Sequence, residues 1–502
     1  MPARLILSLA ALAACLPSAR ADWPEWGGTN SRNMVSPGKN PPVEISPGKK
    51  IKGKDDVDMA TTKGLKWVTR LGSQAYGTPS IANGKVFLGT NNENPFDTKY
   101  VGDRSILLCL DEKTGQMIWQ FASPKIGTGK VSDWEYLGLC SGAAVEGKRI
   151  YLTTNRCEVV CLDTEGLKNG NDGPFVDEAK YFSSPENKID AVGDTDADII
   201  WTFDMREECG VFPHNTTSSN VLVLEDRIYA TTSNGVDWTH TNIPAPEAPS
   251  LICLDKKTGK LLGEEGSGVS KRCLHCSWSS PALATVGGKQ QVIFGGGDGF
   301  AYGFDLSFKK DEDLNIINEL WRYDANPKEY RGTPEAKKKY SDYDGPSEII
   351  ATPVVYKDRI YTQIGQDPEH GEGTGMMTCL DATGKPLWTY KGINRSVSTP
   401  SIVDDLVYVA DYSGLVHCLD ANTGEKIWVY DTKGHVWGST MVIDGKLYIG
   451  NEEGELHILQ TGKTMKEIAT IDFPGPLYAT PIYANDTLYI MTMSHLYAFG
   501  TK

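Results

Sequence analysis

Three cysteines and two histidines have the types and positions that a metal or redox site requires. Cys140, Cys209 and Cys276 each lie a few residues before a segment with strand character, in successive repeats of the chain, and His214 and His275 lie nearby in the sequence. Thiolate and imidazole groups bind soft and borderline metals. A disulfide is the simpler interpretation, so we assign no metal and keep the three cysteines as the candidates if one binds.

The cysteines that follow the N-terminal segment fall into two groups. Five share one repeat position, as small apolar core residues do: Cys109, Cys161, Cys253, Cys379 and Cys418. The other five, an odd number that cannot all pair internally, are Cys140, Cys157, Cys209, Cys273 and Cys276. Their pairing stays open, with Cys273–Cys276 or Cys140–Cys209 as the disulfide choices for an oxidising compartment.

The strands that must position these residues belong to a sequence repeat. Residues 396–430, SVSTPSIVDDLVYVADYSGLVHCLDANTGEKIWVY, contain four short strands rich in Val, Ile, Tyr and Trp, separated by turn residues. A four-stranded antiparallel sheet that recurs about every 40 residues is typical of a propeller blade. First strands recur near Thr78, Ala143, Thr217, Ser280, Thr352, Thr399, Thr440 and Thr480. The sequence therefore predicts an all-β fold, an eight-bladed β-propeller.

The two ends of the repeat array predict how it closes. The C-terminal blade has only three strands, whereas residues 65–68, LKWV, read as a fourth strand without a blade. Pairing between them would remove two open sheet edges. We expect residues 22–64 to form an extension that packs on a propeller of residues 65–502. Polar insertions, expected to be long loops, are Gly166–Asp198, Val236–Pro249, Asn326–Ser347 and Gln366–Gly375.

The N-terminus has the pattern of an export signal. Arg4 precedes a short apolar run, and Ala19-Arg20-Ala21 is an A-x-A cleavage pattern, so residues 1–21 are predicted to be removed. Cys15, after Leu12-Ala13-Ala14, leaves a lipid anchor as a minor alternative. No later apolar run is long enough to span a bilayer. We expect a periplasmic or otherwise extracytoplasmic protein.

The charge balance excludes one class of partner. The chain has 502 residues, 50 basic against 65 acidic, and a net charge of −15. Nucleic-acid binders carry a basic footprint instead, so we predict no nucleic-acid partner. The apolar content of 40% is that of a globular protein.

Three segments that each contain a third strand, a turn and a fourth strand resemble the repeat of a known family. CLDEKTGQMIW (109–119), CLDATGKPLW (379–388) and CLDANTGEKIW (418–428) resemble the quinoprotein (PQQ) repeat of eight-bladed propellers. The resemblance implies that Trp119, Trp388 and Trp428 dock each blade on the next. Further blocks, among them DWPEWGG (22–28), are similar to a bacterial branch known as PQQ-binding-like propellers. Such repeats occur both in quinoprotein alcohol dehydrogenases and in BamB-type assembly lipoproteins, so the fold does not choose the function.

A quinoprotein dehydrogenase would need an aromatic floor, a rigid cover, cationic contacts and bound Ca²⁺. The family's cover is a disulfide between adjacent cysteines, but this sequence has no Cys-Cys pair and no C-x-x-C-H haem motif. Loops before the first strands should converge on the central channel. The candidate cofactor-binding residues in them are Arg395, Trp437, Trp278, His214, Asn215 and His275. Blade packing is the simpler role for the tryptophans.

Three functions remain for such a chain. We favour a non-catalytic binding or scaffold protein that takes a protein or peptide on its loop face. The alternative is a PQQ- and calcium-dependent dehydrogenase of alcohols or sugars. A glycan binder that uses loop aromatics such as Trp134 and Trp238 is the third. The sequence does not identify catalytic residues. If the chain is a binding or scaffold protein, we expect it not to hold PQQ with calcium.

Overall fold

The computed structural model describes residues 21–54 and 56–500. The predicted signal peptide, apart from Ala21, lies outside these residues, as does Cys15. The fold is dominated by short antiparallel strands that follow the repeat along the chain. This confirms the prediction of an all-β protein built from four-stranded antiparallel sheets.

Four of these sheets consist of consecutive strands. The first two contain β5 (Ser80–Ala82), β6 (Lys85–Asn91), β7 (Arg104–Asp111) and β8 (Met117–Pro124), then β9 (Ala144–Glu146), β10 (Arg149–Thr153), β11 (Glu158–Asp163) and β12 (Ile199–Asp204). The other two contain β21 (Val354–Tyr356), β22 (Arg359–Gln363), β23 (Met377–Asp381) and β24 (Pro386–Tyr390), then β25 (Ser401–Val403), β26 (Leu406–Ala410), β27 (Leu415–Asp420) and β28 (Lys426–Asp431). At the predicted turn after β25, Asp404 and Asp405 adopt positive φ values of 51° and 59°, as tight hairpin turns require.

Two further units are joined into one eight-stranded sheet. They are β13 (Leu222–Val223), β14 (Arg227–Thr231), β15 (Leu251–Asp255) and β16 (Leu261–Glu265), and β17 (Ala282–Val286), β18 (Lys289–Gly295), β19 (Phe300–Asp311) and β20 (Leu314–Asp324). The outer strands β16 and β20 pair in parallel at Glu264 and Ile316. Gly263 stands where other repeats carry Trp, and a Cβ there would lie 2.8 Å from the Phe308 ring. Because Gly263 has no side chain, the two units can approach closely enough for β16 and β20 to pair.

The last units recruit strands from the N-terminal region. β29 (Met441–Ile443), β30 (Lys446–Gly450), β31 (Glu455–Gln460) and β32 (Glu467–Asp472) are joined by β1 (Val35–Ser36), which pairs with β29. β33 (Ile482–Ala484), β34 (Thr487–Met491) and β35 (His495–Phe499) are completed by β4 (Leu65–Arg70), which pairs antiparallel with β35. A separate hairpin joins β2 (Lys49–Lys50) and β3 (Val57–Asp58).

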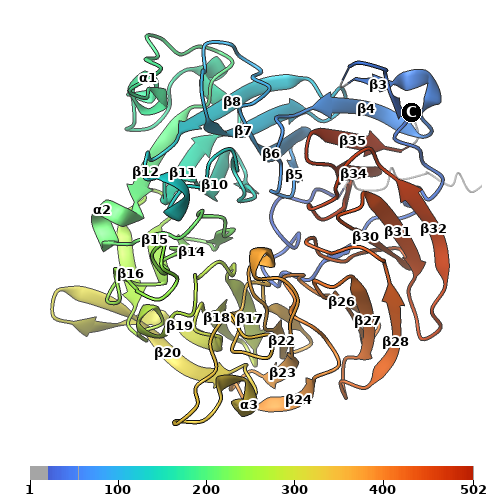
Figure 1. Cartoon of the computed structure of the whole chain (residues 1–502). Helices are drawn as coiled ribbons and strands as arrows, with labels where there is room; N and C mark the ends of the chain where they lie inside the picture. Colours follow the sequence, from blue (N-terminus) through green and yellow to red (C-terminus); the bar gives the residue numbers. More distant parts are fainter. Residues whose placement is uncertain (1–20, 55, 501–502) are drawn as a thin grey trace, which may run out of the picture.

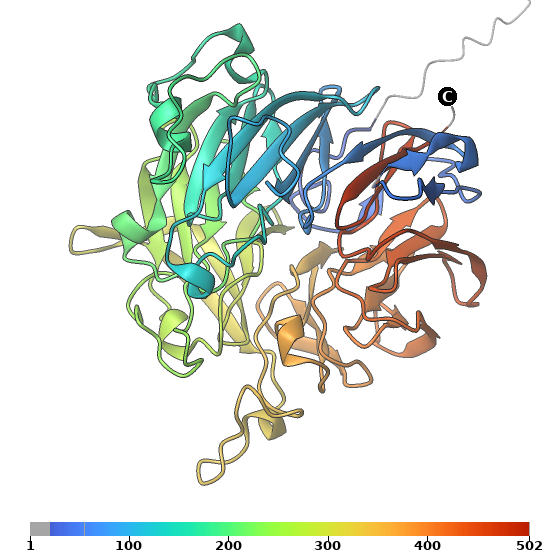
Figure 2. The ribbon, with the colours of Figure 1, turned by 45° about the horizontal axis from the view of Figure 1, so that its top comes forward.

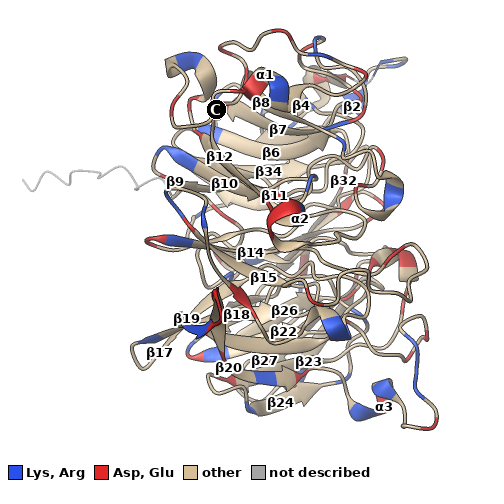
Figure 3. Ribbon diagram, turned by 90° about the vertical axis from the view of Figure 1, so that its left-hand side faces the viewer, with Lys and Arg blue, Asp and Glu red and all other residues tan. Residues whose placement is uncertain are grey.

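The units stand in chain order around a common axis, with β8, β28 and β32 at the rim and β5 and β17 nearer the centre (Figure 1). The helices are short: α1 (Glu178–Phe182), α2 (Met205–Cys209) and α3 (Lys328–Arg331), with 3-10 turns η1 (Met59–Thr61), η2 (Gly129–Val131), η3 (Gly166–Asn169), η4 (Ser270–Arg272) and η5 (Pro368–His370). The loop that carries α3 projects from the body in the tilted view (Figure 2). Charged residues are found mainly in loops and at strand ends, while the strands are mostly uncharged (Figure 3).

Outer-strand tryptophans connect several units to the next one along the chain. Trp119 is fully buried, and Trp388 and Trp428 are 9% exposed. Their Nε1–H groups donate to carbonyl oxygens in the following unit: to Thr164 (3.0 Å), Ala421 (3.0 Å) and Gly462 (2.9 Å) respectively. Gly166, with a φ of 62°, faces Trp119 so closely that a Cβ would lie 2.9 Å from the indole. These contacts are the ones that the docking motif implies.

The segment of residues 22–36 runs along the first strand of one unit after another. Backbone or side-chain hydrogen bonds connect it to β5, β9, β13, β17, β21, β25, β29 and β33. Arg32 anchors the segment: it is fully buried, and its guanidinium donates to the carbonyl oxygens of Pro281, Val221 and Trp26 and to the Glu25 carboxylate. The open edges of the first strands are therefore covered by the chain's own N-terminal segment.

Candidate functional site

The loops at one end of the first strands surround a central cavity of about 370 Å³. Its wall is aromatic, with rings contributed by Trp26, Tyr76, Trp134, Trp278 and Trp437. Trp26 belongs to the N-terminal segment and is held by a 3.0 Å hydrogen bond from its Nε1–H to the Thr352 hydroxyl. The cavity is thus built from side chains that lie far apart in the sequence, brought together by the common axis.

Acidic side chains complete the wall of this cavity. Asp367 and Glu369 line it, and among the described residues neither a lysine nor an arginine does. Burial, with a smaller contribution from the nearby Glu348 and Glu369 carboxylates, raises the pKa of Asp367 to about 7. The cavity therefore offers π faces and carboxyl groups, which suit an apolar or cationic group better than an anion.

Next to the cavity, aromatic rings form a cluster that we call the aromatic mouth: Tyr76, Tyr412, His435, Trp437 and Tyr478. Tyr76 and Tyr478 are stacked with ring centroids 5.6 Å apart, Trp437 lies 4.6 Å from Tyr478, and Tyr412 stacks on His435 at 4.5 Å.

Carboxylates border the aromatic mouth. Glu452 accepts a 3.2 Å hydrogen bond from Trp437 Nε1 and lies 3.4 Å from His435 Nδ1, and Glu372 lies 3.3 Å from His435 Nε2. The mouth is thus aromatic in its centre and acidic at its border.

The structure places the predicted site residues in three different surroundings. Trp278, Trp437 and Asn215 line the cavity. His214 and His275 do not line it; they are fully buried beside Trp278, with ring centroids 6.3 and 5.2 Å from the indole. The structure therefore brings the two tryptophans and the asparagine to one cavity, while the two histidines belong to a neighbouring cluster.

Arg395, a candidate cofactor-binding residue, does not line the cavity. Its side chain is buried, and its guanidinium donates to the carbonyl oxygens of Asp342 and Glu372, which ties two insertion loops together. Burial lowers its pKa below the usual arginine value. Arg395 therefore serves loop structure in this fold, and it is not available to an anion in the channel.

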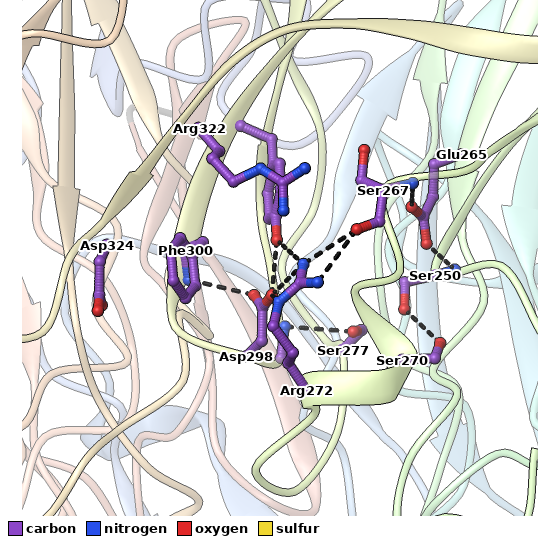
Figure 4. A network of polar contacts seen from close by, with 12 residues as sticks. Ser250, Glu265, Ser267, Ser270, Arg272, Ser277, Asp298, Phe300, Arg322 and Asp324 are labelled. Carbon is purple, nitrogen blue, oxygen red and sulfur yellow. Dashed lines mark hydrogen bonds and ion pairs between the residues drawn. The ribbon is translucent and has the colours of Figure 1, made fainter. Parts of the chain in front are cut away.

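Arg272, another basic residue of the channel loops, is also engaged elsewhere (Figure 4). It pairs with the buried Asp298 at 3.0 Å and donates to the Tyr302 hydroxyl at 2.7 Å and to the Ser267 carbonyl oxygen. Nearby, the buried Glu265 accepts backbone hydrogen bonds from Ser250 and Ser267. This network joins the loop after β16 to β19, so Arg272 holds two units together.

The three candidate cysteines do not form a metal site. In the part of the chain that the structure describes, the ten cysteines are unpaired, and no group of three metal-ligating atoms includes a cysteine. Cys140 lines the cavity, but burial raises the pKa of its thiol to about 12. Burial also raises the pKa of Cys276 well above its usual value. Neither disulfide alternative is formed, and both thiols are poor ligands as they stand.

Comparison with known proteins identifies the repeat. A family model described as outer membrane protein assembly factor BamB matches residues 103–272 and 318–501, more than half of the chain. This chain belongs to that family. It is a PQQ-repeat β-propeller protein, as the resemblance of the strand-turn-strand units implied. No curated protein matches its sequence.

Solved structures share the fold of this PQQ-repeat protein. BamB from Moraxella catarrhalis is 15% identical, with a TM-score of 0.55 over 86% of this chain and 98% of that one. A europium-containing methanol dehydrogenase is 12% identical, with a TM-score of 0.61 over 96% and 99% of the two chains. The computationally designed Ika8 protein is 10% identical, with a TM-score of 0.50 over 88% and 100%. At these identities the likeness concerns the fold alone.

The residues of this PQQ-repeat protein do not fit a pyrroloquinoline quinone in the cavity. The quinone carries three carboxylates, whereas the described cavity wall offers the amides of Gln74, Asn215 and Asn220, two carboxyl side chains and no basic residue to balance these charges. Arg272 and Arg395, the nearest candidates by sequence, are held by other partners. The aromatic rings meet the stacking requirement and the amides part of the polar one, but no cation offsets the charge of the quinone.

Sequence reasoning missed several residues of this region. Trp26 and Tyr76 of the cavity wall, and His240 and His370 beside His214 and His275, were not singled out. Trp26 carried a signal, because it lies in the DWPEWGG block that resembles a known branch. His240 and His370 lie in the predicted insertions, whose sequence has no periodicity from which a position in space can be inferred.

Proposed function

We propose that this chain is an exported, non-catalytic β-propeller that binds a protein partner at the aromatic mouth. One observation carries the proposal: the cavity and its border combine aromatic rings with carboxylates, and neither lysine nor arginine is among the described wall residues of the cavity. Such a surface suits a partner segment that presents lysine, arginine or aromatic side chains, because cations interact favourably with both π faces and carboxylates. The net charge of −15 favours the same class of partner.

The proposal includes an architecture. Residues 22–64 are the N-terminal extension, and residues 65–502 are a propeller of eight blades closed by β4 on the C-terminal blade. The pairing of Tyr497 with Val68 and of Ala498 with Trp67 supports this closure. Trp67 adds support, because its Nε1–H donates to the Glu112 carbonyl oxygen (3.0 Å) in the same manner as the other docking tryptophans.

We place the protein in the periplasm or another extracytoplasmic compartment, after removal of residues 1–21. The support is the export pattern of the N-terminus and the family's description as an outer membrane assembly factor. In the described part of the chain, no helix has the length and apolarity needed to cross a bilayer. A lipid anchor at Cys15 remains the minor alternative to a soluble form.

Peptide binding tests the proposed function. We expect a short peptide of alternating lysine and tryptophan residues to bind the mature protein, and its counterpart with glutamate in place of lysine not to bind. Trp437→Ala should weaken binding of the basic peptide roughly 10-fold or more, as for a central aromatic contact. Isothermal titration calorimetry measures both affinities. Trp238→Ala is the matched control, because that tryptophan is 63% exposed and does not line the cavity. Equal binding of the two peptides, or an unchanged affinity of Trp437→Ala, would contradict the proposal.

The dehydrogenase alternative is tested by quinone retention. After incubation with PQQ and Ca²⁺ followed by gel filtration, we expect the protein to retain no stoichiometric quinone, because the cavity lacks cationic partners for its carboxylates. Absorbance of the protein fraction measures retention, and dye reduction with alcohols and aldoses measures turnover. One quinone per chain, lost in Trp437→Ala and Trp278→Ala, would establish the cofactor in this cavity and favour the enzyme.

A further inference from the structure

Four histidines from four loops meet beside the channel: His214 from the loop before β13, His240 from the loop between β14 and β15, His275 from the loop before β17, and His370 at the end of η5. The ring centroids of His214 and His275 lie 4.4 Å apart, and His240 lies 5.1 Å from each. His370 lies 4.9 Å from His275. Two of the predicted insertions, Val236–Pro249 and Gln366–Gly375, thus each deliver a histidine to the same point.

The nitrogen atoms of this cluster are placed as ligand atoms. One ring nitrogen each from His214, His240 and His275 lies within 4.8 Å of the others. His214 Nδ1 donates to the Val236 carbonyl oxygen at 2.6 Å, so its Nε2 carries a lone pair. Among the described residues, His214 Nε2 and both ring nitrogens of His275 are buried and have no hydrogen-bond partner.

Buried polar atoms without a partner are costly to a folded protein. Three such nitrogens in adjacent rings call for an additional group between them. We propose that His214, His240 and His275 bind one divalent transition-metal ion of the zinc class, each through one ring nitrogen. This site goes beyond the proposed function, because it lies behind Trp278 and outside the cavity wall.

The chemistry of the donors selects the class of metal. Three imidazoles favour zinc, copper or nickel over calcium and magnesium, which prefer oxygen ligands. Burial lowers the pKa of His214 and of His275 to about 3, with a smaller contribution from neighbouring histidines, so both rings are neutral at pH 7 and their lone pairs are available. The fourth coordination position is left to water or to His370, whose Nδ1 is also buried without a partner among the described residues.

One of the histidines already has the kind of outer contact that metal-binding histidines require, and a polar group lies near a second. The Val236 carbonyl fixes the His214 ring through its Nδ1–H. The buried Glu348 carboxylate lies 3.7 Å from His275 Nδ1, and Tyr340 stacks on the His275 ring at 5.2 Å while its hydroxyl donates to Glu348. Zinc–nitrogen bonds are about 2.0–2.1 Å long. The three ring nitrogens, which lie within 4.8 Å of one another, must therefore come closer together to bind one ion. Of the three histidines, His240 is the exposed one and therefore the least constrained by packing.

Metal titration of the tag-free mature protein tests this site. After treatment with EDTA and gel filtration, we expect calorimetry to detect one high-affinity zinc ion per chain. His240→Ala and His275→Ala should weaken binding by more than the roughly 10–100-fold that loss of an outer-shell contact costs. His240 is exposed, so its variant should fold normally, which circular dichroism checks. His435→Ala is the matched control, because that histidine belongs to the aromatic mouth.

Cobalt substitution and thermal melting give independent readouts. We expect the cobalt-loaded protein to show visible absorption bands of nitrogen coordination without a thiolate charge-transfer band, and the bands to disappear in His240→Ala. Zinc should raise the melting temperature of the parent but not of the His240→Ala variant. The proposal is overturned if zinc does not bind stoichiometrically, if His240→Ala binds like the parent, if His435→Ala loses binding equally, or if the spectrum indicates thiolate ligands such as Cys276.

Discussion

A chain that lacks residues 22–70 is expected to lose the single, sharp unfolding transition of the parent protein. The deletion removes β4, which is the partner of β35, and the N-terminal segment that covers the first strands of successive units. It also removes Arg32 and leaves its carbonyl acceptors in the core without a donor. Urea unfolding followed by tryptophan fluorescence and circular dichroism measures the transition, and the two signals should no longer coincide.

Two single substitutions separate the contributions to this result. Arg32→Ala removes the anchor of the N-terminal segment, and Trp67→Ala removes the docking residue of β4; both should lower the free energy of unfolding. Arg322→Ala is the matched control, because that arginine forms a surface pair with Glu319 and should change stability by less than about 1 kcal/mol. A deletion variant that unfolds as sharply as the parent would disprove the closure by β4.

Trp119→Ala is expected to lower the free energy of unfolding by about 3–5 kcal/mol, the range for truncation of a large core aromatic residue. The indole is fully buried, packs against the turn at Gly166 and donates to the Thr164 carbonyl oxygen of the next unit. Truncation would leave a cavity between two units and an acceptor without its donor. Chemical denaturation measures the loss.

Trp238→Ala is the control for this substitution as well. That side chain is 63% exposed, so its removal should change the free energy of unfolding by less than about 0.5 kcal/mol. If Trp119→Ala costs less than 1 kcal/mol, the tryptophans are not the docking elements between units.

The repeat made most of the strands predictable. The column of Cys109, Cys379 and Cys418, the Trp residues opposite them and the turn residues between strands recur at fixed offsets, so alternation and turn chemistry agree. The joint between β16 and β20 was not predictable. It depends on the absence of a side chain at Gly263 and on the unusual length of β19 and β20, and neither has a counterpart in the other repeats.

The candidate site was predictable only as far as the repeat reaches. Trp278 and Trp437 stand at a fixed position before a first strand, which places them at the channel. Arg395 lies two residues further from its first strand than these tryptophans do, and its side chain turns toward carbonyl groups of two insertion loops whose paths no pattern encodes. The same reason explains His240 and His370, because an irregular loop gives no spacing from which its position can be derived.

The N-terminal segment has a consequence for the order in which the molecule can be completed. Trp23 pairs with Ile81 early in the chain, whereas Ser36 donates to the carbonyl oxygen of Tyr483 near its end. The start of this segment can therefore pair early, whereas its end finds its final partners only when almost the whole chain is present. Such sequence-distant contacts slow folding and leave apolar strands open in the meantime. The protein can therefore aggregate until its C-terminal strands have formed and have paired with the N-terminal segment.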